Sequence, residues 1–226
     1  MAKQELYDKS PIRIFDNATE GGLKAGEIGL VTAKKGLGKT SVLVQFGMDT
    51  LLDGNQLVHV SFDQHSSNVI SWYDGIFTEI ARKKNLLNAD EVKENVFRNR
   101  TILNFNQENF NLTRVVNTLN ALNAGGIKIA GVVIDGVDLK KVEADELQAV
   151  QAYAKASKAS IWMSANAEGE SIKENIPSPL EPFFTAVINL TSKDNNVKIN
   201  ILKFRDKKDI ETGMKLDTKS FLILEK

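Results

Sequence analysis

Eight residues near the N-terminus have the types and the spacing of a phosphate-binding loop. Residues 33–40 read Ala-Lys-Lys-Gly-Leu-Gly-Lys-Thr, which matches the pattern G-x-x-x-x-G-K-[ST] with alanine in the first position. Gly36 and Gly38 lack a side chain, so successive backbone N–H groups can point into one concavity and hold phosphate oxygens. The sequence therefore predicts a site for the phosphates of a nucleotide.

The loop gives most of its polar residues an expected role. Lys39 is expected to reach the β- and γ-phosphates, and the Thr40 hydroxyl is expected to bind Mg²⁺. Lys34 and Lys35 either stay solvated or add positive charge beside the phosphates. The alternative is a glycine-rich turn that binds nothing, but an apolar strand before the loop and a helix after it favour phosphate binding. The expected nucleotide-binding residues are Ala33, Lys34, Lys35, Gly36, Leu37, Gly38, Lys39, Thr40 and Ser41.

Besides the Thr40 hydroxyl, an acidic residue is needed to hold Mg²⁺ through water, at the end of an adjacent apolar strand. The run "IAGVVID", Ile129 to Asp135, supplies it in Asp135, and Asp138 is a second acid nearby. Taken alone, Asp135 could simply cap the end of its strand. With the phosphate loop upstream, the metal role is favoured, so Thr40 and Asp135 are the expected metal residues.

The elements around these residues alternate between strand and helix over the first 165 residues. Residues 185–226 instead contain alternating segments, such as "VKINILKF", which predict antiparallel strands. The pattern is typical of an α/β fold: a mostly parallel twisted sheet with helices on both faces and an antiparallel C-terminal extension. We expect one domain over residues 1–226, with an irregular arm at residues 1–20. Ser66 and Ser67 are the expected N-caps of the helix that follows the second strand.

The composition excludes several classes of protein. The chain has 226 residues, 42% hydrophobic and 26% charged, with a formal net charge of zero and no cysteine. No global basic field therefore attracts nucleic acid, and neither disulfides nor a thiol nucleophile are available. The N-terminus has no apolar core of the signal-peptide type, and no apolar run is long enough to span a bilayer. We expect a cytoplasmic protein.

The order of the motifs resembles the RecA-like branch of the P-loop ATPases, and within it the KaiC-like single-domain proteins, with the DnaB and RadA helicase or recombinase cores as relatives. "GGLKAGEIGLVTAKKGLGKT" is similar to that family's glycine pair, Gly-Glu, strand and phosphate loop; "IKIAGVVIDGVDL" resembles its Walker B strand. The resemblance runs from about residue 10 to about residue 215. It implies a RecA-like fold that binds ATP with Mg²⁺.

The segment "LVHVSFDQHSSNVI" resembles the family's next strand, which carries the catalytic glutamate. Here the slot contains Asp63 and Gln64. Asp63 keeps a carboxylate but is one methylene shorter, whereas Gln64 can hold a water molecule and cannot take its proton. We therefore expect slow hydrolysis of ATP, or none. Alternatively, Asp63 caps the following helix.

The segment "INILKFRDKK" resembles the family's late strand, which ends in a Lys-x-Arg pair. The resemblance makes Lys203 and Arg205 candidate catalytic fingers, which would share one face of the strand and reach the γ-phosphate of a neighbouring subunit. It also implies a ring, most simply a hexamer. The alternative is a solvated charge pair on an edge strand. "SIWMSAN" resembles the sensor strand, with Asn166 as a candidate sensor one position late.

The loop after that strand argues against DNA. It contains four glutamates and one lysine, which would repel phosphates: Glu168, Glu170, Glu174, Glu181 and Lys173. No stacking aromatic lies in this loop or in the loop after Asp135. His59 is expected in the core or at an interface, and His65 is a weaker candidate for contact with the site.

Three functions follow from these residues. The first is a slow ATPase that forms rings and acts through an unidentified protein partner. The second is a scaffold in which ATP ties subunits together without being hydrolysed. The third is a DNA helicase or recombinase core.

Overall fold

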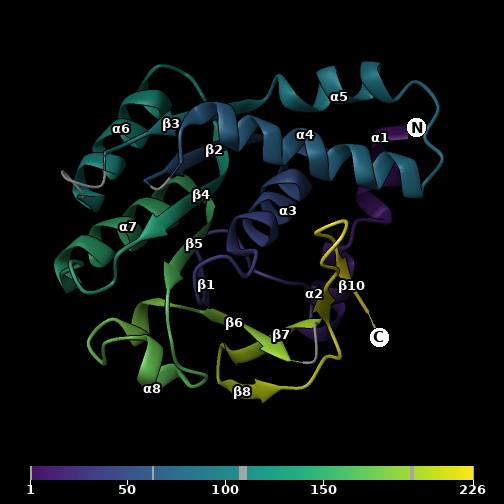
Figure 1. The fold of residues 1–226 in the computed structure, drawn as a ribbon. Coiled ribbons are helices and arrows are strands. Elements are labelled where there is room, and N and C mark those ends of the chain that lie inside the picture. The colour runs from purple at the N-terminus through teal and green to yellow at the C-terminus, as the bar shows by residue number, and fades with distance from the viewer. Residues whose placement is uncertain (1, 63, 107–110, 194–195, 226) are drawn as a thin grey trace.

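The computed structural model describes residues 2–62, 64–106, 111–193 and 196–225, and its centre is one β-sheet (Figure 1). The strand order is β10-β9-β7-β6-β1-β5-β4-β2-β3, and β8 pairs with β7. Six strands in the middle and at one edge run parallel: β6 (Ala186–Lys193), β1 (Ile28–Ala33), β5 (Ser160–Asn166), β4 (Ile129–Val137), β2 (Gln56–Ser61) and β3 (Arg100–Asn104). The prediction of a mostly parallel α/β sheet is confirmed.

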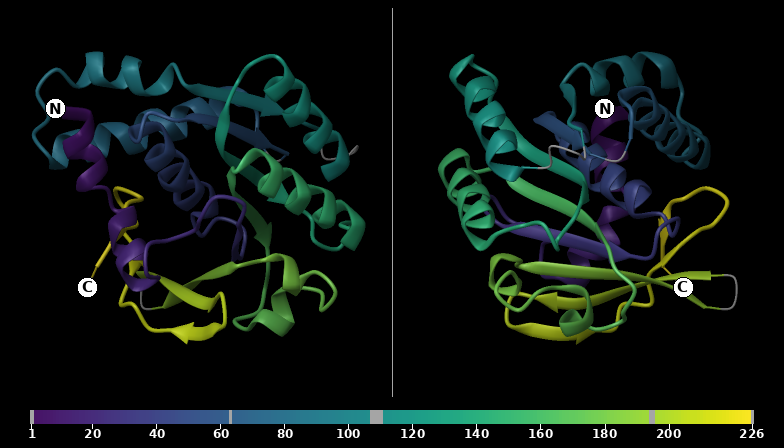
Figure 2. Two further views of the ribbon diagram at one scale, coloured as in Figure 1. Left: turned by 180° about the vertical axis from the view of Figure 1, so that it is seen from behind. Right: turned by 60° about the vertical axis from the view of Figure 1, so that its left-hand side comes forward.

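Helices cover both faces of this sheet, which explains why its central strands are continuous apolar runs rather than alternating ones. One face carries α3 (Lys39–Leu52), α4 (Ser66–Lys83) and α5 (Ala89–Phe97). The other carries α6 (Leu112–Ala124), α7 (Ala144–Ser157), the short α8 (Ile172–Asn175) and the 3₁₀ turn η2 (Glu181–Phe183) (Figure 2). Among the described residues, none of the helices combines the length and the apolar character needed to cross a bilayer.

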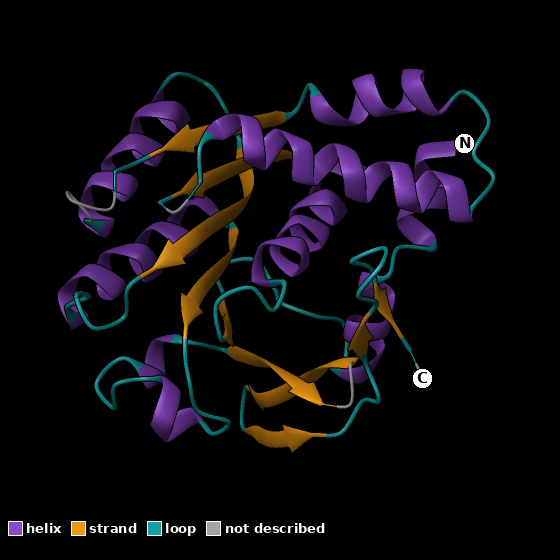
Figure 3. Cartoon of the chain, viewed as in Figure 1, coloured by secondary structure: helices purple, strands orange, loops and turns teal. Residues whose placement is uncertain are grey.

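The antiparallel part of the sheet is smaller than the sequence predicts. β6 pairs in parallel with β1, so this strand belongs to the parallel sheet and only its other edge, facing β7 (Asn196–Phe204), is antiparallel. The remaining antiparallel strands are β8 (Lys207–Ile210), β9 (Lys215–Leu216) and β10 (Ile223–Leu224) (Figure 3). The sequence alone cannot tell the direction of β6, because a strand's apolar pattern is the same whichever neighbour it joins.

The N-terminal segment is not irregular, contrary to the sequence prediction. It forms two seven-residue helices, α1 (Ala2–Asp8) and α2 (Ile12–Ala18). Leu6, Ile12 and Phe15 of these helices are at most 3% exposed, and Phe15 packs edge-on against three other aromatic rings, namely Phe46, Trp162 and Phe204. Helices this short are marginal in isolation, so tertiary burial rather than local periodicity stabilises them.

Two further helical features differ from expectation. The N-cap of α4 is His65, whose Nδ1 accepts a hydrogen bond from the backbone N–H of Ser67 at 3.4 Å. Ser66 and Ser67, the expected caps, lie inside the first turn instead. The second is α5, a helix that the sequence pattern of residues 89–97 does not predict; it follows Asn88, a residue in the left-handed conformation with φ of 57°.

His59 lies in the core of β2, one of the two environments that the sequence indicates. Its side chain is fully buried, and its Nδ1 is 3.1 Å from the Tyr73 hydroxyl, in a part of the core lined also by Arg100. Burial, with a smaller effect from the Arg100 charge, lowers the pKa of His59 from 6.5 to about 3. The imidazole is therefore neutral in the folded protein at neutral pH.

His59 makes stability depend on pH in a defined direction. Between about pH 6.5 and about pH 3 the unfolded chain binds a proton at this residue and the folded chain does not, so stability falls as the pH falls through this window. The slope from this group is about 1.4 kcal/mol per pH unit. Urea unfolding of His59→Leu at pH 7, 6 and 5 should show a correspondingly flatter pH dependence than the wild type.

The control for this measurement is Val58→Ala, since Val58 lies next to His59 in β2, is fully buried and carries no titratable group. This variant should keep the wild-type slope even though the cavity lowers absolute stability. Equal slopes in wild type and His59→Leu would contradict the assignment of a neutral, buried imidazole.

Candidate nucleotide-binding site

The loop between β1 and α3 has the backbone that phosphate binding requires. Gly36 and Gly38 have φ of 87° and 95°, a region in which residues with a side chain are strained. Gly38 is also the N-cap of the 14-residue helix α3, so the positive end of the helix dipole points into the loop. The sequence prediction for this loop matches its conformation.

The Lys39 side chain folds back over the loop. Its ammonium donates to the carbonyl oxygens of Ala33 and Lys34 at 3.2 and 3.3 Å and to Asn166 Oδ1 at 2.8 Å. Asn166 is the last residue of β5 and is the register partner of Ala33 across the β1–β5 pair. The sensor position suggested by the sequence is thus in direct contact with the loop lysine.

Thr40 and Asp135, the expected metal residues, are in contact with one another. The Thr40 hydroxyl donates to Asp135 Oδ2 at 2.7 Å, although the two residues are 95 positions apart in the sequence. Asp135 is 2% exposed and lies at the carboxyl end of β4. The pair offers Mg²⁺ one hydroxyl and one carboxylate, hard oxygen donors that suit this ion when the remaining positions go to phosphates and water. The described residues contain no cluster of three or more His, Asp or Glu that could form a separate all-protein metal site.

Gln64 lies beside this pair. Its Nε2 donates to the Thr40 hydroxyl at 2.9 Å, and its backbone N–H donates to Ser61 Oγ at 3.0 Å. The Asn104 side chain bonds to its carbonyl oxygen. Gln64 is therefore held directly beside the Thr40–Asp135 pair. Asp63, the other candidate in this slot, lies outside the described residues.

The other loop residues contribute packing or surface charge. Lys34 forms an ion pair with Glu168 at 3.8 Å, and because both side chains are largely exposed this pair adds little stability. Lys35 is exposed. Ser41 is buried and donates to the Gly38 carbonyl oxygen at 2.8 Å, which fixes the first turn of α3. Leu37 is half-buried against the core on the α3 side.

Lys203 and Arg205 lie at the other end of the sheet. Lys203 pairs with Val187 near the start of β6, whereas the phosphate loop follows the carboxyl end of β1. Val187 is level with Leu30, three residues before Ala33 at the start of the loop, so the two levels are roughly 10 Å apart along the strands. Arg205 lies beyond the end of β7 with φ of 53°, so the alternating strand expected to carry both residues ends before it.

Both cations make contacts within their own chain. Arg205 forms a two-pronged ion pair with Glu27, with both N···O distances at 3.1 Å, and also donates to the Gly22 carbonyl oxygen. Lys203 donates to the Glu181 carbonyl oxygen at 3.1 Å and is 3.7 Å from its carboxylate. Within one subunit, these side chains do not meet the residues of the phosphate loop.

The acidic loop after β5 is ordered by its own capping interactions. Glu174 accepts from the Ser171 hydroxyl at 2.7 Å and from the backbone N–H groups of Glu170 and Ser171. These bonds lower the pKa of Glu174, so the carboxylate remains charged at neutral pH. Glu174 therefore contributes a negative charge to this surface while its carboxylate orders the loop.

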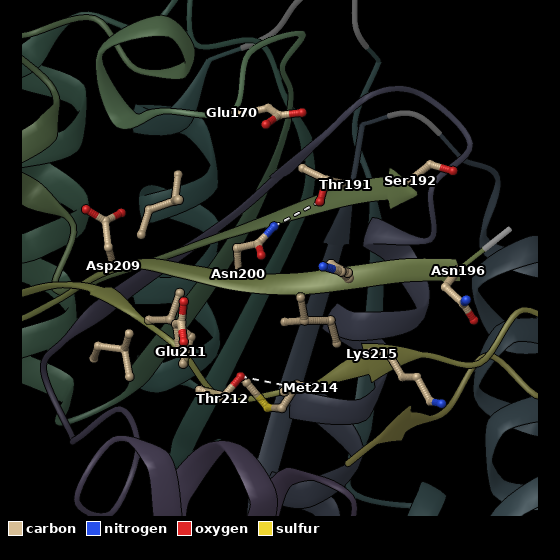
Figure 4. Close-up of a pocket in the computed structure, with 16 residues that line it drawn as sticks. Glu170, Thr191, Ser192, Asn196, Asn200, Asp209, Glu211, Thr212, Met214 and Lys215 are labelled. Carbon is tan, nitrogen blue, oxygen red and sulfur yellow. Dashed lines mark hydrogen bonds between the residues drawn. The ribbon is translucent and has the colours of Figure 1, made fainter. Parts of the chain in front are cut away.

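A separate hollow of about 910 Å³ lies on the antiparallel side of the sheet (Figure 4). Its walls come from β6, β7 and the segment that joins β8 to β9, and two of its lining residues are hydrogen-bonded, with Asn200 donating to Thr191 at 2.9 Å. None of the phosphate-loop residues, Asp135 or Gln64 lines it. This hollow is distinct from the candidate site at the carboxyl ends of the parallel strands.

The sequence did not indicate three contacts within the site. Ser61 and Asn104 fix the backbone of Gln64, and Ser164 of β5 donates to Asp135 Oδ1 at 2.5 Å. These are small polar residues at the carboxyl ends of parallel strands, which is the signal that could have identified them.

In a comparison with protein families, a model described as "ATPase: KaiC" matches residues 9–157, which is more than half of the chain. The match includes the phosphate loop, Gln64 and Asp135, and ends before Asn166, Lys203 and Arg205. A search of curated proteins finds no match.

Gly38→Ala tests the geometry of the loop. A side chain there is strained by about 1–2 kcal/mol at positive φ, and the added methyl group would overlap the Leu216 side chain. We expect ATP affinity, measured by calorimetric titration, to fall at least about tenfold. The matched control is Gly75→Ala in α4, which is exposed and has no atom within 4 Å of the added methyl group. It should bind ATP as the wild type does, and unchanged affinity in Gly38→Ala would contradict the assigned loop.

Proposed function

The chain belongs to the KaiC ATPase family, and from that premise we propose that it binds ATP with Mg²⁺, hydrolyses it slowly, and works in rings whose sites two subunits share. The family match covers residues 9–157 and supports an ATP-binding protein of RecA-like fold. The observation that carries the proposal is the contact of Thr40 with Asp135 directly beside the two positive-φ glycines of the loop.

Each residue of the site has a proposed task. The backbone N–H groups from Gly36 to Thr40 bind phosphate oxygens, and Lys39 adds positive charge at the β- and γ-phosphates. To reach the phosphates, Lys39 exchanges its bonds to two carbonyl oxygens for bonds to phosphate. The bond from its ammonium to Asn166 Oδ1 orients the side chain. Thr40 and Asp135 hold Mg²⁺, which neutralises the charge that develops on the transferred phosphoryl group.

Slow hydrolysis follows from the residues beside the terminal phosphate. The Gln64 amide can orient a water molecule by hydrogen bonds, but it cannot accept the proton of that water. Asp63 is the carboxylate next to it in the sequence, with a side chain one methylene shorter than glutamate. A displacement of about 1 Å costs on the order of a hundredfold in rate.

Binding without hydrolysis, in a scaffold held together by ATP, is the second candidate function. The observation that favours it is Gln64, an amide, in the slot beside Thr40.

Sharing of the site between subunits is supported by the position of Lys203 and Arg205. They are too far from the phosphate loop of their own chain to act on it, and they lie at the opposite end of the sheet, where Lys203 is paired with Glu181 and Arg205 with Glu27. In a ring, that end of one subunit would face the loop of the next, and a cation there stabilises charge in the transition state. The loop after β5 carries four glutamates and one lysine, which opposes DNA binding and makes a protein partner the better proposal.

The turnover of ATP tests the catalytic slot. We expect wild type to release labelled phosphate slowly, Asp63→Ala to lose most of that activity, and Asp63→Glu to gain about tenfold, because the longer side chain reaches closer to the attacking water. Calorimetric ATP affinity should stay the same in all three. Equal turnover in wild type and Asp63→Ala would remove Asp63 as the catalyst, and absence of turnover in every variant, with ATP-dependent assembly retained, would favour the scaffold.

A subunit-mixing experiment tests the shared site. Lys39→Ala removes the phosphate lysine and leaves the fingers intact, whereas Arg205→Ala removes a finger and leaves the loop intact. Each variant alone should turn over ATP at least about a hundredfold more slowly than wild type. An equimolar mixture should regain part of the activity, because some interfaces then combine an intact loop with an intact finger. Lys208→Ala, an exposed lysine of β8, is the control and should behave as wild type. No recovery in mixed rings would contradict shared sites.

A further inference from the structure

Strand β4 breaks its register with β5 where it carries Asp135. The ladder pairs Ile134 with Met163 and then Val137 with Ala165, so Asp135 and Gly136 bulge out of the β4–β5 pairing. Gly136 has φ of 85°, which glycine adopts without strain. Bulges of this kind bend a strand locally and re-aim a side chain, and they are frequent beside functional sites.

Ser164 fills this bulge from the neighbouring strand. It is fully buried in β5, and its Oγ accepts a hydrogen bond from the Gly136 backbone N–H at 3.0 Å. The same hydroxyl donates to Asp135 Oδ1 at 2.5 Å. The Ser164 side chain therefore contacts both residues of the bulge: the backbone N–H of Gly136 and the carboxylate of Asp135.

The two oxygens of Asp135 are consequently held by two hydroxyl groups from different strands. Thr40 donates to Oδ2 and Ser164 donates to Oδ1. Both hydroxyl protons point to the carboxylate because its oxygens only accept, and the Thr40 and Ser164 oxygens in turn accept from the Gln64 amide and the Gly136 N–H. Rotation of the carboxylate would break at least one of these bonds, so its plane is fixed while the acceptor positions not used by the hydroxyls remain open to a metal-bound water.

We propose that Ser164 is a positioning residue for the metal site: by bridging the Gly136 N–H and Asp135 Oδ1, it sets the orientation in which Asp135 serves Mg²⁺ and Thr40. The inference rests on the proposed function, because it concerns the same nucleotide site. Ser164 touches neither nucleotide nor metal; it acts through Asp135, as partners behind a metal ligand do.

The proposal separates two parts of ATP affinity. The phosphate loop binds ATP without metal, through its N–H groups and Lys39. Lys39 bonds to loop carbonyl oxygens and Asn166, whereas Ser164 bonds to Gly136 and Asp135. Mg²⁺ adds a further gain in affinity, and this gain depends on the orientation of Asp135. Loss of the Ser164 hydroxyl should reduce the second part and leave the first part unchanged.

The test is calorimetric titration of the full chain with ATP, in excess Mg²⁺ and in EDTA. In Ser164→Ala, we expect the gain in affinity from Mg²⁺ to fall about tenfold, the scale of losses on removing a partner behind a metal ligand. The affinity in EDTA should stay within about twofold of wild type. Ser164→Thr keeps the hydroxyl and should restore the gain. Ser160→Ala, at the other end of the same strand, is the matched control and should behave as wild type in both titrations.

The outcomes are distinguishable. An unchanged gain from Mg²⁺ in Ser164→Ala would overturn the positioning role, and so would an equal loss of affinity in EDTA and in Mg²⁺, which is what damage to the fold would produce. Absence of ATP binding by wild type in both solutions would overturn the proposed function and this inference with it.

Discussion

Parallel pairing of β1, β5, β4 and β2 is the constraint on which the candidate site depends. Because these strands run in one direction, their carboxyl ends meet at a single edge of the sheet, and with them Ala33, Asn166, Asp135 and Ser61. The bond between Thr40 and Asp135 closes over this edge and joins the start of α3 to the end of β4, two strands away from β1. The contacts of Thr40 with Asp135 and of Lys39 with Asn166, which span 95 and 127 positions in the sequence, follow from this one choice of strand direction.

The C-terminal strands complete the same region from the other side. Leu216 of β9 packs beside Gly38, and Gln45 of α3 bonds to the Phe221 carbonyl oxygen at 2.9 Å and to the Ile223 N–H at 2.9 Å. The helix that follows the phosphate loop is thus tied at its second turn to the end of the chain. On the N-terminal side, Arg13 of α2 forms an ion pair with Asp49 of α3. Both termini therefore stabilise α3 in the position that the phosphate loop requires.

The parallel sheet, the loop conformation and the pairing of Thr40 with Asp135 could be predicted from the sequence. Each depends on a local motif, and these motifs occur along the chain in the order that the fold requires. The sequence was insufficient for α1 and α2, whose short helices depend on the burial of residues such as Phe15, and for β6, whose direction depends on its neighbour. The bulge at Gly136 and its contact with Ser164 were equally hidden, since a register shift between two strands leaves no mark in either strand alone. Position 63 shows a further limit: the sequence indicates a carboxylate there but not where its oxygens lie.

The central claim is that residues 33–40 and Asp135 form one site for ATP and Mg²⁺. A crystal structure of the chain with a non-hydrolysable ATP analogue and Mg²⁺ tests it most directly. The account predicts the phosphates within the loop between β1 and α3, with the metal on the Thr40 hydroxyl at about 2.1 Å and Asp135 in its surroundings. An analogue bound elsewhere, such as in the hollow beside β7, with the loop empty, would contradict it.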